Sequence, residues 1–475
     1  MKRNPRLWRS VFAAITFAFA GDSVTGAGAA TPNILLIVGD DMGYADVGFH
    51  GCKDIPTPNL DALAASGVRF TSGYVSGPYC SPTRAGMLTG RYQTRFGHEF
   101  NPDGAGNGLP LTETTTADRL KAAGYATGLV GKWHLGAKPE HHPLKRGFGE
   151  FYGFLGGAHS YVQSASMWRG TNPVTELDYT TDAFGREAVA FIEHHKREPW
   201  FLYLAFNAVH TPMQATDDRL AKFVKESDEK RRTYDAMMLA MDEAIGRVRE
   251  KLADSGLETN TLVFFIADNG GPVMPGTSIN ASRNEPLRGG KRTTLEGGVR
   301  VPFLASWPGR LKPAVYAQPA IQLDLTATAL AVAGVTPKPE WKLEGVDLMP
   351  YLLGEKSGVP HDALYWRFGE QWAIRAGDFK LVQYDGNADS MTGKRNQPVS
   401  AVKLYNLAKD VGETNDLAAA MPDKVKELEA KWNAWNASNT KPRWGAAHTD
   451  NDGAEPGTRP SKKAKPGTAA VGSEL

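Results

Sequence analysis

Two short apolar segments, each followed at once by acidic or amide side chains, limit the folds open to this chain. Residues 33–38 lead through a glycine into two aspartates at 40–41, and residues 261–267 lead into Asp268 and Asn269. A short apolar run without polar alternation is typical of a strand buried on both faces, as in a parallel sheet covered by helices. Ligand sites in such sheets lie outside the carboxyl ends of the strands. The pattern therefore predicts both a fold class and the edge of the sheet that carries the site.

Strand-like and helix-like segments alternate along the first 340 residues, which favours a mostly parallel sheet with helices on both faces. Further strands are expected at 68–75, 126–130, 200–206 and 301–307. Helices are expected at 58–66, 115–123, 182–196, 228–253 and 322–333, with another beginning near 81. Pro58 and Gly67 suit the first position and the end of the first of these helices.

The pattern changes near residue 340. Short aromatic-rich runs joined by turn residues predict a small antiparallel sheet, with an amphipathic helix at 422–435 behind it. The runs lie at 363–368, 372–375, 380–384 and 403–406. We therefore expect a large α/β domain at 31–340 and a small α+β domain at 341–440. Residues 441–475 are rich in Gly, Pro, Lys and Ala, and we expect them to be a disordered tail.

The first 30 residues have the layout of a secretory signal peptide. Four basic residues precede an apolar run at 11–20, and small residues follow at 27–30. Cleavage is expected after Ala20, Ala29 or Ala30, and the mature protein is expected to be periplasmic or secreted. The alternative, an N-terminal anchor, is disfavoured because a bilayer span needs about 20 apolar residues. No other stretch is long enough, so no transmembrane helix is expected.

Composition excludes several classes of function. The chain has 54 Lys and Arg against 52 Asp and Glu, a net charge of +2, which provides no field for non-specific binding of nucleic acid. Its two cysteines cannot form a disulfide framework or a cysteine-rich zinc array.

The acidic and amide pairs at the two strand ends suggest one shared cation. Asp40 and Asp41 follow the first strand, and Asp268 and Asn269 follow the later one. Oxygen ligands of this kind suit hard cations such as Ca²⁺ and Mg²⁺. Either pair alone could equally be a turn, because Asp and Asn are common turn residues. Their equivalent positions favour a metal site.

Cys80 lies in an unusual context, Gly-Pro-Tyr-Cys-Ser-Pro-Thr-Arg-Ala-Gly at 77–86. It could be a buried free thiol or half of a disulfide with Cys52. However, it stands at a predicted helix start with Arg84 four positions later. A helix N-terminus and an arginine both offer donors to an anion.

Several ordered blocks of the sequence resemble type I sulfatases. Residues 80–84 match the family signature Cys-x-Pro-x-Arg, and 131–136 (Gly-Lys-Trp-His-Leu-Gly) also look like that family. The resemblance extends over about residues 32–420 and includes the segments 33–43, 210–212, 268–271 and 289–291. It implies an alkaline-phosphatase-like fold, with a large mostly parallel sheet between helices and a smaller C-terminal antiparallel sheet.

The resemblance also implies how Cys80 is used. In the family this cysteine is oxidised to formylglycine by a maturation enzyme, and the hydrated aldehyde offers two oxygens. One attacks sulfur, and the second lets the covalent sulfate ester collapse to aldehyde and sulfate. Asp40, Asp41, Asp268 and Asn269 resemble the ligands of the family's divalent metal, usually Ca²⁺ with Mg²⁺ as the alternative, and residue 80 contacts the same ion.

The remaining family positions receive roles in the same way. Arg84 is expected to hold the hydrate, and Lys132 to neutralise sulfate oxygens. His134 resembles the base that expels sulfate, while His210 and Lys291 resemble the pair that binds sulfate and protonates the leaving oxygen. The plainer interpretation of each is a solvated surface charge or a loop residue. His98 could line the substrate pocket or lie in an exposed loop.

The sequence therefore predicts an exported sulfatase that acts through a formylglycine-sulfate intermediate. A sulfated carbohydrate is the expected substrate, because Trp and Tyr in loops such as 167–172 can stack on sugar rings. Alternatives are an arylsulfatase acting on small aryl sulfates and a phosphonate or phosphodiester hydrolase on the same scaffold. A last alternative is a non-catalytic protein that binds sulfated glycans.

Overall fold

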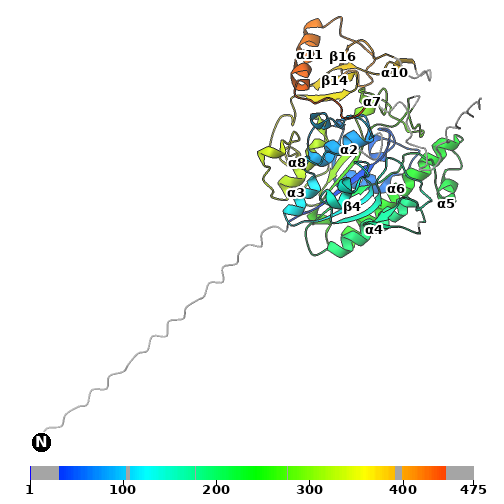
Figure 1. The fold of residues 1–475 in the computed structure, drawn as a ribbon, viewed down its shortest axis with the longest axis vertical. Helices are drawn as coiled ribbons and strands as arrows, with labels where there is room; N and C mark the ends of the chain where they lie inside the picture. The colour runs from blue at the N-terminus through cyan, green and yellow to red at the C-terminus, as the bar shows by residue number, and fades with distance from the viewer. Residues whose placement is uncertain (2–30, 103–106, 177, 275–276, 391–397, 446–475) are drawn as a thin grey trace, which may run out of the picture.

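A ten-stranded mixed sheet forms the centre of the protein (Figure 1). The computed structural model describes Met1 and residues 31–102, 107–176, 178–274, 277–390 and 398–445. The rest of the predicted signal segment and residues 446–475 of the predicted tail lie outside the described residues. The strands, in spatial order, are β11 (Ala314–Tyr316), β2 (Gly67–Phe70), β10 (Phe303–Ser306), β9 (Thr261–Ala267), β1 (Asn33–Gly39), β8 (Trp200–Ala205), β4 (Ala126–Lys132), β5 (Glu150–Phe154), β6 (Trp168–Arg169) and β7 (Asn172–Pro173).

Strand β1 lies in the middle of the parallel part of this sheet. It pairs in parallel with β8, where Leu36 lies opposite Tyr203, and with β9, where Leu36 lies opposite Phe264. All seven residues of β1 are buried, as are all seven of β9. The predicted doubly covered parallel strands are therefore confirmed, and β4 and β5 extend the parallel set beyond β8.

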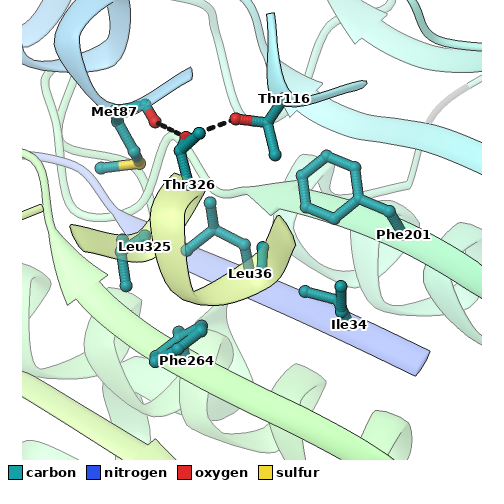
Figure 2. A pocket seen from close by; sticks show the side chains of 9 residues that line it. Ile34, Leu36, Met87, Thr116, Phe201, Phe264, Leu325 and Thr326 are labelled. Carbon is teal, nitrogen blue, oxygen red and sulfur yellow. Dashed lines mark hydrogen bonds between the residues drawn. The ribbon is translucent and has the colours of Figure 1, made fainter. Parts of the chain in front are cut away.

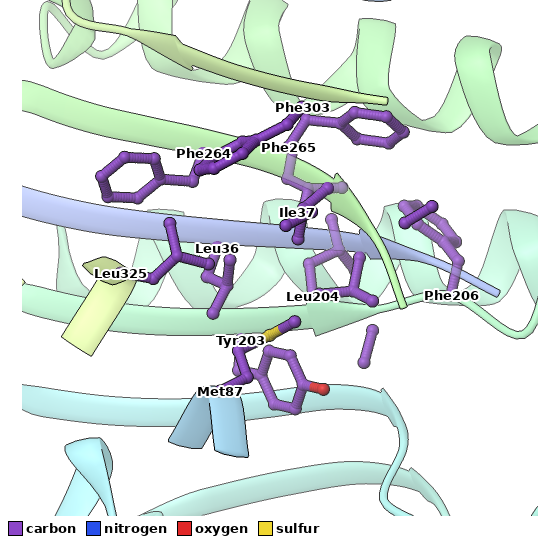
Figure 3. Close-up of a cluster of buried hydrophobic side chains, with 14 of the residues drawn as sticks. Leu36, Ile37, Met87, Tyr203, Leu204, Phe206, Phe264, Phe265, Phe303 and Leu325 are labelled. Carbon is purple, nitrogen blue, oxygen red and sulfur yellow. The ribbon is translucent and has the colours of Figure 1, made fainter. Parts of the chain in front are cut away.

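Helices cover both faces of the sheet (Figure 1). One layer contains α2 (Cys80–Thr89), α3 (Thr116–Ala122) and α8 (Leu323–Val332), and the other contains α1 (Pro58–Ala65), α4 (Thr180–His195) and α6 (Glu229–Asp254). In Figure 3, Leu36 of β1 lies beside Met87 and Leu325 of the first layer. Figure 2 shows the seam where Thr326 donates to the Met87 carbonyl and bonds the Thr116 hydroxyl, beside a void of only about 10 Å³.

Helix starts follow local side-chain chemistry. The Asp228 carboxylate accepts the backbone N–H groups of Lys230 and Arg231 at the start of α6. Thr115 and Asp118 form a reciprocal capping box at the start of α3. These caps satisfy amide groups that the first turn of a helix leaves without partners.

The sheet departs from the prediction at its edges. The segment 68–75 is two strands, because the chain bends after β2 and β3 (Gly73–Tyr74) pairs instead with β12 (Ala320–Ile321) in a separate two-stranded sheet. A Cβ at Gly73 would lie 2.6 Å from Cβ of Phe303, so only glycine allows this close passage. Strand β10 runs antiparallel to both β9 and β2, and β5, β6 and β7 were not predicted.

The C-terminal part is the predicted four-stranded antiparallel sheet. Its strands are β13 (Leu364–Phe368), β14 (Gln371–Ala376), β15 (Phe379–Gln383) and β16 (Lys403–Asn406), and α11 (Pro422–Asn436) packs on it. Leu428 and Trp432 of α11 join a cluster with Trp372 and Ile374. Short helices α5 (Asp217–Leu220), α7 (Glu296–Val299), α9 (Met349–Leu352) and α10 (Asn387–Ser390) complete the description. Within the described ranges, no helix has the length and apolarity needed to cross a membrane.

Residues 441–445 differ from the expected disordered tail. Trp444 is buried against Phe100 and Phe368, and its indole N–H is 3.0 Å from the Phe100 carbonyl and 2.9 Å from the Asn101 carbonyl. Composition alone pointed to disorder here because one tryptophan carries most of the packing in an otherwise polar segment.

A buried charge cluster joins the two parts of the chain. Lys380 of β15 lies 2.9 Å from the Glu296 carboxylate of α7 and 2.9 Å from the Glu413 carboxylate, and all three side chains are fully buried. Burial raises the pKa of Glu413 to about 7 despite the opposing charge of Lys380. Burial also tends to raise the pKa of Glu296, but Lys380 and Arg300 outweigh it and hold that pKa at about 2.

Replacing Lys380 by methionine is expected to lower the free energy of unfolding by about 3–5 kcal/mol, because two buried carboxylates lose their common cation. Denaturant-induced unfolding of the purified variant measures this change. Lys409→Met is the matched control, since Lys409 is exposed and should change stability by less than about 0.5 kcal/mol. Equal stability of both variants and the parent would show that the cluster contributes nothing.

Candidate active site

The predicted site residues converge beyond the carboxyl ends of four neighbouring parallel strands. Asp40 and Asp41 follow β1, and Asp268 and Asn269 follow β9. Lys132 is the last residue of β4, and His210 lies in the loop after β8. Since β9, β1, β8 and β4 are adjacent in the sheet, segments more than 200 residues apart in the chain meet at one edge.

Cys80 is the first residue of helix α2, and its side chain points at Asp40 and Asp41, which follow β1. Its thiol lies 3.6 Å from Asp40 Oδ1 and 3.9 Å from Asp41 Oδ1. The side chain is fully buried, and neither cysteine is in a disulfide, so the alternative pairing with Cys52 is not formed. Burial raises the pKa of the Cys80 thiol well above its usual range, although Lys132 and Lys291 oppose the shift. An unmodified Cys80 is therefore a neutral thiol and a weak nucleophile.

Arg84 and Lys132 form the cationic wall on the Asp40 side. Lys132 Nζ lies 2.5 Å from Asp40 Oδ2. The Arg84 guanidinium donates to Asp268 Oδ2 through Nε at 3.0 Å and Nη2 at 2.8 Å, and it also reaches Asp40 Oδ2 at 3.6 Å. All four side chains are fully buried. Such cations, held away from water, act strongly on an anion placed beside them.

Lys291 and His210 form a second cationic wall on the Asp41 side. Lys291 Nζ lies 2.9 Å from Asp41 Oδ2 and 3.4 Å from His210 Nε2. His210 Nδ1 faces the Thr211 carbonyl at 2.6 Å, which fixes the ring and turns Nε2 toward the site. Burial alone raises the pKa of Asp41, but the charges of Lys291 and His210 outweigh it and hold that pKa below its usual range.

His134 lies two residues after Lys132, in the loop that follows β4. Its backbone has a left-handed φ of +58°, its N–H donates to the Leu155 carbonyl at 3.2 Å, and its carbonyl accepts the Ser81 hydroxyl at 2.6 Å. A Cβ on Gly157 would lie 2.6 Å from His134 Nε2. The glycine therefore leaves the space that the imidazole fills.

The oxygen atoms of the site fit a divalent cation. Ligand atoms of Asp40, Asp41, Cys80 and His210 all lie within 4.8 Å of one another. Asn269 is fully buried, its amide nitrogen donates to Asp41 Oδ1 at 2.8 Å, and its Oδ1 has no hydrogen-bond donor among the described residues. A buried amide oxygen without a donor is costly unless a ligand contacts it.

The charge on Asp268 supports the same conclusion. Burial, added to repulsion from Asp40, raises the pKa of Asp268 to about 6 even though Arg84 and Lys132 oppose the shift. A divalent cation beside these carboxylates would relieve that repulsion. Three aspartates face three cationic side chains, so an added divalent ion would make the site positive and attractive to an anionic ester.

Two residues of the site were missed by sequence reasoning. Ser278 Oγ donates to Asp41 Oδ2 at 3.0 Å and lies 3.1 Å from Lys291 Nζ. Asn280 is fully buried and its amide donates to the carbonyls of Asp41 and Val209. Both come from the long connection after β9, where serine and asparagine give no local signal of a role.

His98 is placed behind the site. It is fully buried, and its Nε2 lies 2.6 Å from the hydroxyl of Ser81, the residue that follows Cys80. Burial lowers the pKa of His98 to about 3, so the ring is neutral and its Nε2–H donates to Ser81. Trp444 packs edge-on against the ring at 4.8 Å. His98 thus braces the start of α2.

A second group of metal-type side chains lies on the surface, where Glu150, His194 and His195 come together. His195 bridges Glu150 and Glu198 at 2.8 Å each, and these carboxylates raise the pKa of the imidazole despite its partial burial. An ion pair explains this group without a metal.

The chain is similar to known proteins over most of its length. The family model described as Sulfatase matches residues 32–335, and the one described as N-sulphoglucosamine sulphohydrolase, C-terminal, matches residues 289–432. Human N-acetylgalactosamine-6-sulfatase is 36% identical over 445 residues, 84% of this chain and 83% of that protein. Human arylsulfatase A is 35% identical over 450 residues, 84% of this chain and 86% of that protein. The crystal structure of Ps i-CgsB in complex with k-i-k-neocarrahexaose matches with a TM-score of 0.80 at 35% identity, covering 88% of this chain and 95% of that one.

Proposed function

The chain belongs to the sulfatase family, and on that premise we propose that it removes sulfate from a carbohydrate sulfate ester. One observation carries the proposal: a potential nucleophile at Cys80 is enclosed by Arg84, Lys132 and Lys291 beside a cluster of carboxylates. The carbohydrate substrate is supported by a relative named for a sulfated sugar and by a neighbour solved with an oligosaccharide. Export to the periplasm or medium is supported by the signal-like first 30 residues.

We propose that Cys80 is converted to formylglycine by a maturation enzyme and that Ca²⁺, or Mg²⁺, is held by Asp40, Asp41, Asp268 and Asn269 beside residue 80. Formylglycine would supply a hydrated aldehyde as nucleophile, and the ion would act as a Lewis acid next to it. The position of the Cys80 thiol, 3.6 Å from Asp40 Oδ1 and 3.9 Å from Asp41 Oδ1, and the Asn269 Oδ1 that has no donor among the described residues support these assignments.

The chain's own cations would bind the sulfate. Lys132 and Arg84 contact Asp40, and Lys291 contacts Asp41, the two carboxylates that face the Cys80 thiol. They are buried and held by the aspartates, so they need not reorganise as negative charge develops on the sulfate oxygens. This arrangement favours the charge distribution of the transition state.

Two histidines would move the protons. His210 Nε2, within 3.4 Å of Lys291 Nζ, is placed to protonate the oxygen of the departing alcohol together with that lysine. His134 would take the proton from the nucleophilic residue when sulfate is released. The left-handed backbone at His134 and its Ser81 contact hold the ring's loop in place.

Hydrolysis of a defined substrate panel tests the proposal. We expect kcat/KM to be at least about tenfold higher for sulfated monosaccharides than for 4-nitrophenyl sulfate, because only the sugars present hydroxyls for the site to bind. The kcat/KM on both kinds of sulfate should exceed the kcat/KM on 4-nitrophenyl phosphonates and phosphodiesters. Released sulfate and 4-nitrophenol are measured on the mature protein with Ca²⁺ present. Higher kcat/KM on a phosphonate or diester than on every sulfate would support the rival hydrolase instead.

Gly157→Ala is expected to lower kcat about 10–100-fold, because the new methyl group would overlap His134 Nε2 and displace the imidazole. Turnover of the best sulfate ester measures the effect. Gly445→Ala is the control, because this glycine is exposed and its new Cβ would meet no atom within 4 Å. If both variants keep the parental kcat, the position of His134 does not matter for the reaction.

A further inference from the structure

A cavity of about 550 Å³ lies beside the two site histidines. It is lined by the end of β5, by the loop leading to β6, and by the segment two to four residues after His210. Leu155 of its wall accepts the backbone N–H of His134 at 3.2 Å, and Gly157 in the same loop contacts the His134 ring. The volume is in the range of small-molecule sites. The cavity therefore adjoins the site through Leu155, which His134 contacts, and through Pro212, which follows His210 by two residues.

The walls of the cavity are aromatic and polar but carry no acidic side chain, lysine or arginine among the described lining residues. Phe154, Leu155, Trp168 and Pro212 supply apolar surface, and Gln163, Ser166 and Gln214 supply hydrogen-bonding groups. This combination fits a ring with apolar C–H faces and hydroxyl edges.

The polar lining is fixed in place by its own hydrogen bonds. Gln214 Oε1 accepts the Ser160 hydroxyl at 3.0 Å and the Tyr161 N–H at 2.8 Å, which leaves its NH₂ group for a ligand. Both His159 nitrogens are turned toward backbone carbonyls, Nδ1 to Ser160 at 2.5 Å and Nε2 to Ala165 at 2.7 Å, and the neutral ring donates to one of the two. Its ring stacks on Phe154.

Trp168 is the aromatic platform of this cavity. It is half-buried and lies on β6, where its backbone pairs with Gly153 of β5 and Pro173 of β7. A tryptophan held on paired strands presents its ring at low entropic cost.

From this lining we propose, resting on the function proposed above, that the cavity receives an uncharged sugar ring of the substrate and discriminates against rings that carry a second sulfate or a carboxylate. A second anionic group bound in the cavity would lose part of its hydration without meeting a lysine or arginine, and a partly desolvated charge without a partner is disfavoured. The neutral ring would stack on Trp168 and bond Gln214, with the sulfate directed toward Lys132 and Lys291.

The test compares N-acetylgalactosamine and galactose bearing a single sulfate at each position with the same sugars bearing a second sulfate. The mature Ca²⁺-loaded protein is expected to show at least about tenfold lower kcat/KM on the disulfated sugars. Trp168→Ala should lower kcat/KM on the best monosulfated sugar about tenfold or more, while Trp168→Phe should retain most of it. Melting temperatures of the variants check that they are folded.

A lysine introduced into the cavity lining tests the assignment in a second way. Ala165→Lys adds a cation at an exposed position of the lining and should raise kcat/KM on the disulfated sugars about tenfold relative to the monosulfated ones. Val162→Lys, in the same loop but outside the lining, is the matched control and should leave that ratio unchanged. Equal turnover of both substrate classes, unaltered by Ala165→Lys, would overturn the cavity assignment.

If the proposed sulfatase function is wrong, the experiments give a different result from the one expected when only the cavity assignment is wrong. A protein that hydrolyses no sulfate ester at all would contradict that function, and calorimetric binding of the same sugars to Cys80→Ala would then judge the cavity. Tighter binding of monosulfated than disulfated sugars, lost in Trp168→Ala, supports the assignment, and the absence of such a preference overturns it.

Discussion

Replacing Cys80 by alanine is expected to lower kcat on the best sulfate ester by about four orders of magnitude or more. The substitution removes the proposed nucleophile at the start of α2, and loss of a nucleophile typically removes nearly all turnover of the chemical step. The surrounding cations and carboxylates remain, so binding of sulfate and of Ca²⁺ should change much less. Released sulfate measured under saturating substrate gives the result.

Cys52→Ala is the matched control for this experiment. Cys52 is a half-buried thiol that donates to Asp54 Oδ1 at 3.0 Å, and burial raises its pKa to about 11, so it has no part in the proposed chemistry. Its variant should keep the parental kcat. Mass spectrometry of the peptide containing residue 80 should show loss of sulfur in active protein. An unmodified thiol in fully active protein, or near-parental turnover by Cys80→Ala, would refute the proposed nucleophile.

Removal of the metal with a chelator is the second change expected to abolish turnover, with activity restored by Ca²⁺. Three fully buried carboxylates lie at the site, and without a cation burial and the neighbouring Asp40 raise the pKa of Asp268 to about 6. The ion also stabilises the fold. At a concentration 100 times its Kd, a ligand that binds only the folded state adds about 2.7 kcal/mol. Calorimetric melting with and without Ca²⁺ measures this gain.

Asn269→Ala tests whether the metal removed by the chelator is bound at this site. Loss of the amide oxygen that has no donor among the described residues should weaken Ca²⁺ affinity about 10–100-fold. Asn415→Ala, at an exposed position of the C-terminal part, should leave that affinity unchanged. If Asn269→Ala binds Ca²⁺ as tightly as the parent, Asn269 is not a ligand; full activity after chelation would remove the metal from the mechanism altogether.

The sequence was informative wherever local pattern decides structure. The apolar runs of β1 and β9, the bounds of α3 and α6 and the aromatic strands of the C-terminal sheet were predicted closely, because burial on both faces and helical periodicity leave local signals. Strand β5, with the sequence Glu-Phe-Tyr-Gly-Phe, has no such signal. Its place beside β4 depends on tertiary pairing, as does the antiparallel direction of β10.

The candidate site was likewise predictable from the sequence only in part. Residues directly after strands, such as Asp40 and Asp268, were predictable because the topology of a parallel sheet brings strand ends together. Ser278 and Asn280 lie in a long connection without regular structure, and their contacts with Asp41 are known only from the folded arrangement. His98 could not be separated from an exposed loop because its burial depends on Trp444, more than 300 residues later.

The order of strands also determines how long Cys80 stays in an unfolded chain during synthesis. Strand β1 lies between β8 and β9, so the central sheet that encloses Cys80 cannot close until Ala267 has been synthesised, about 190 residues after the cysteine. At roughly 5–20 residues per second, the unmodified residue stays in an unfolded chain for on the order of ten seconds or longer. Once the chain folds, Cys80 has no exposed surface. The maturation enzyme of the proposed mechanism would therefore have to act within this interval, and a chain that folds unmodified would keep its thiol.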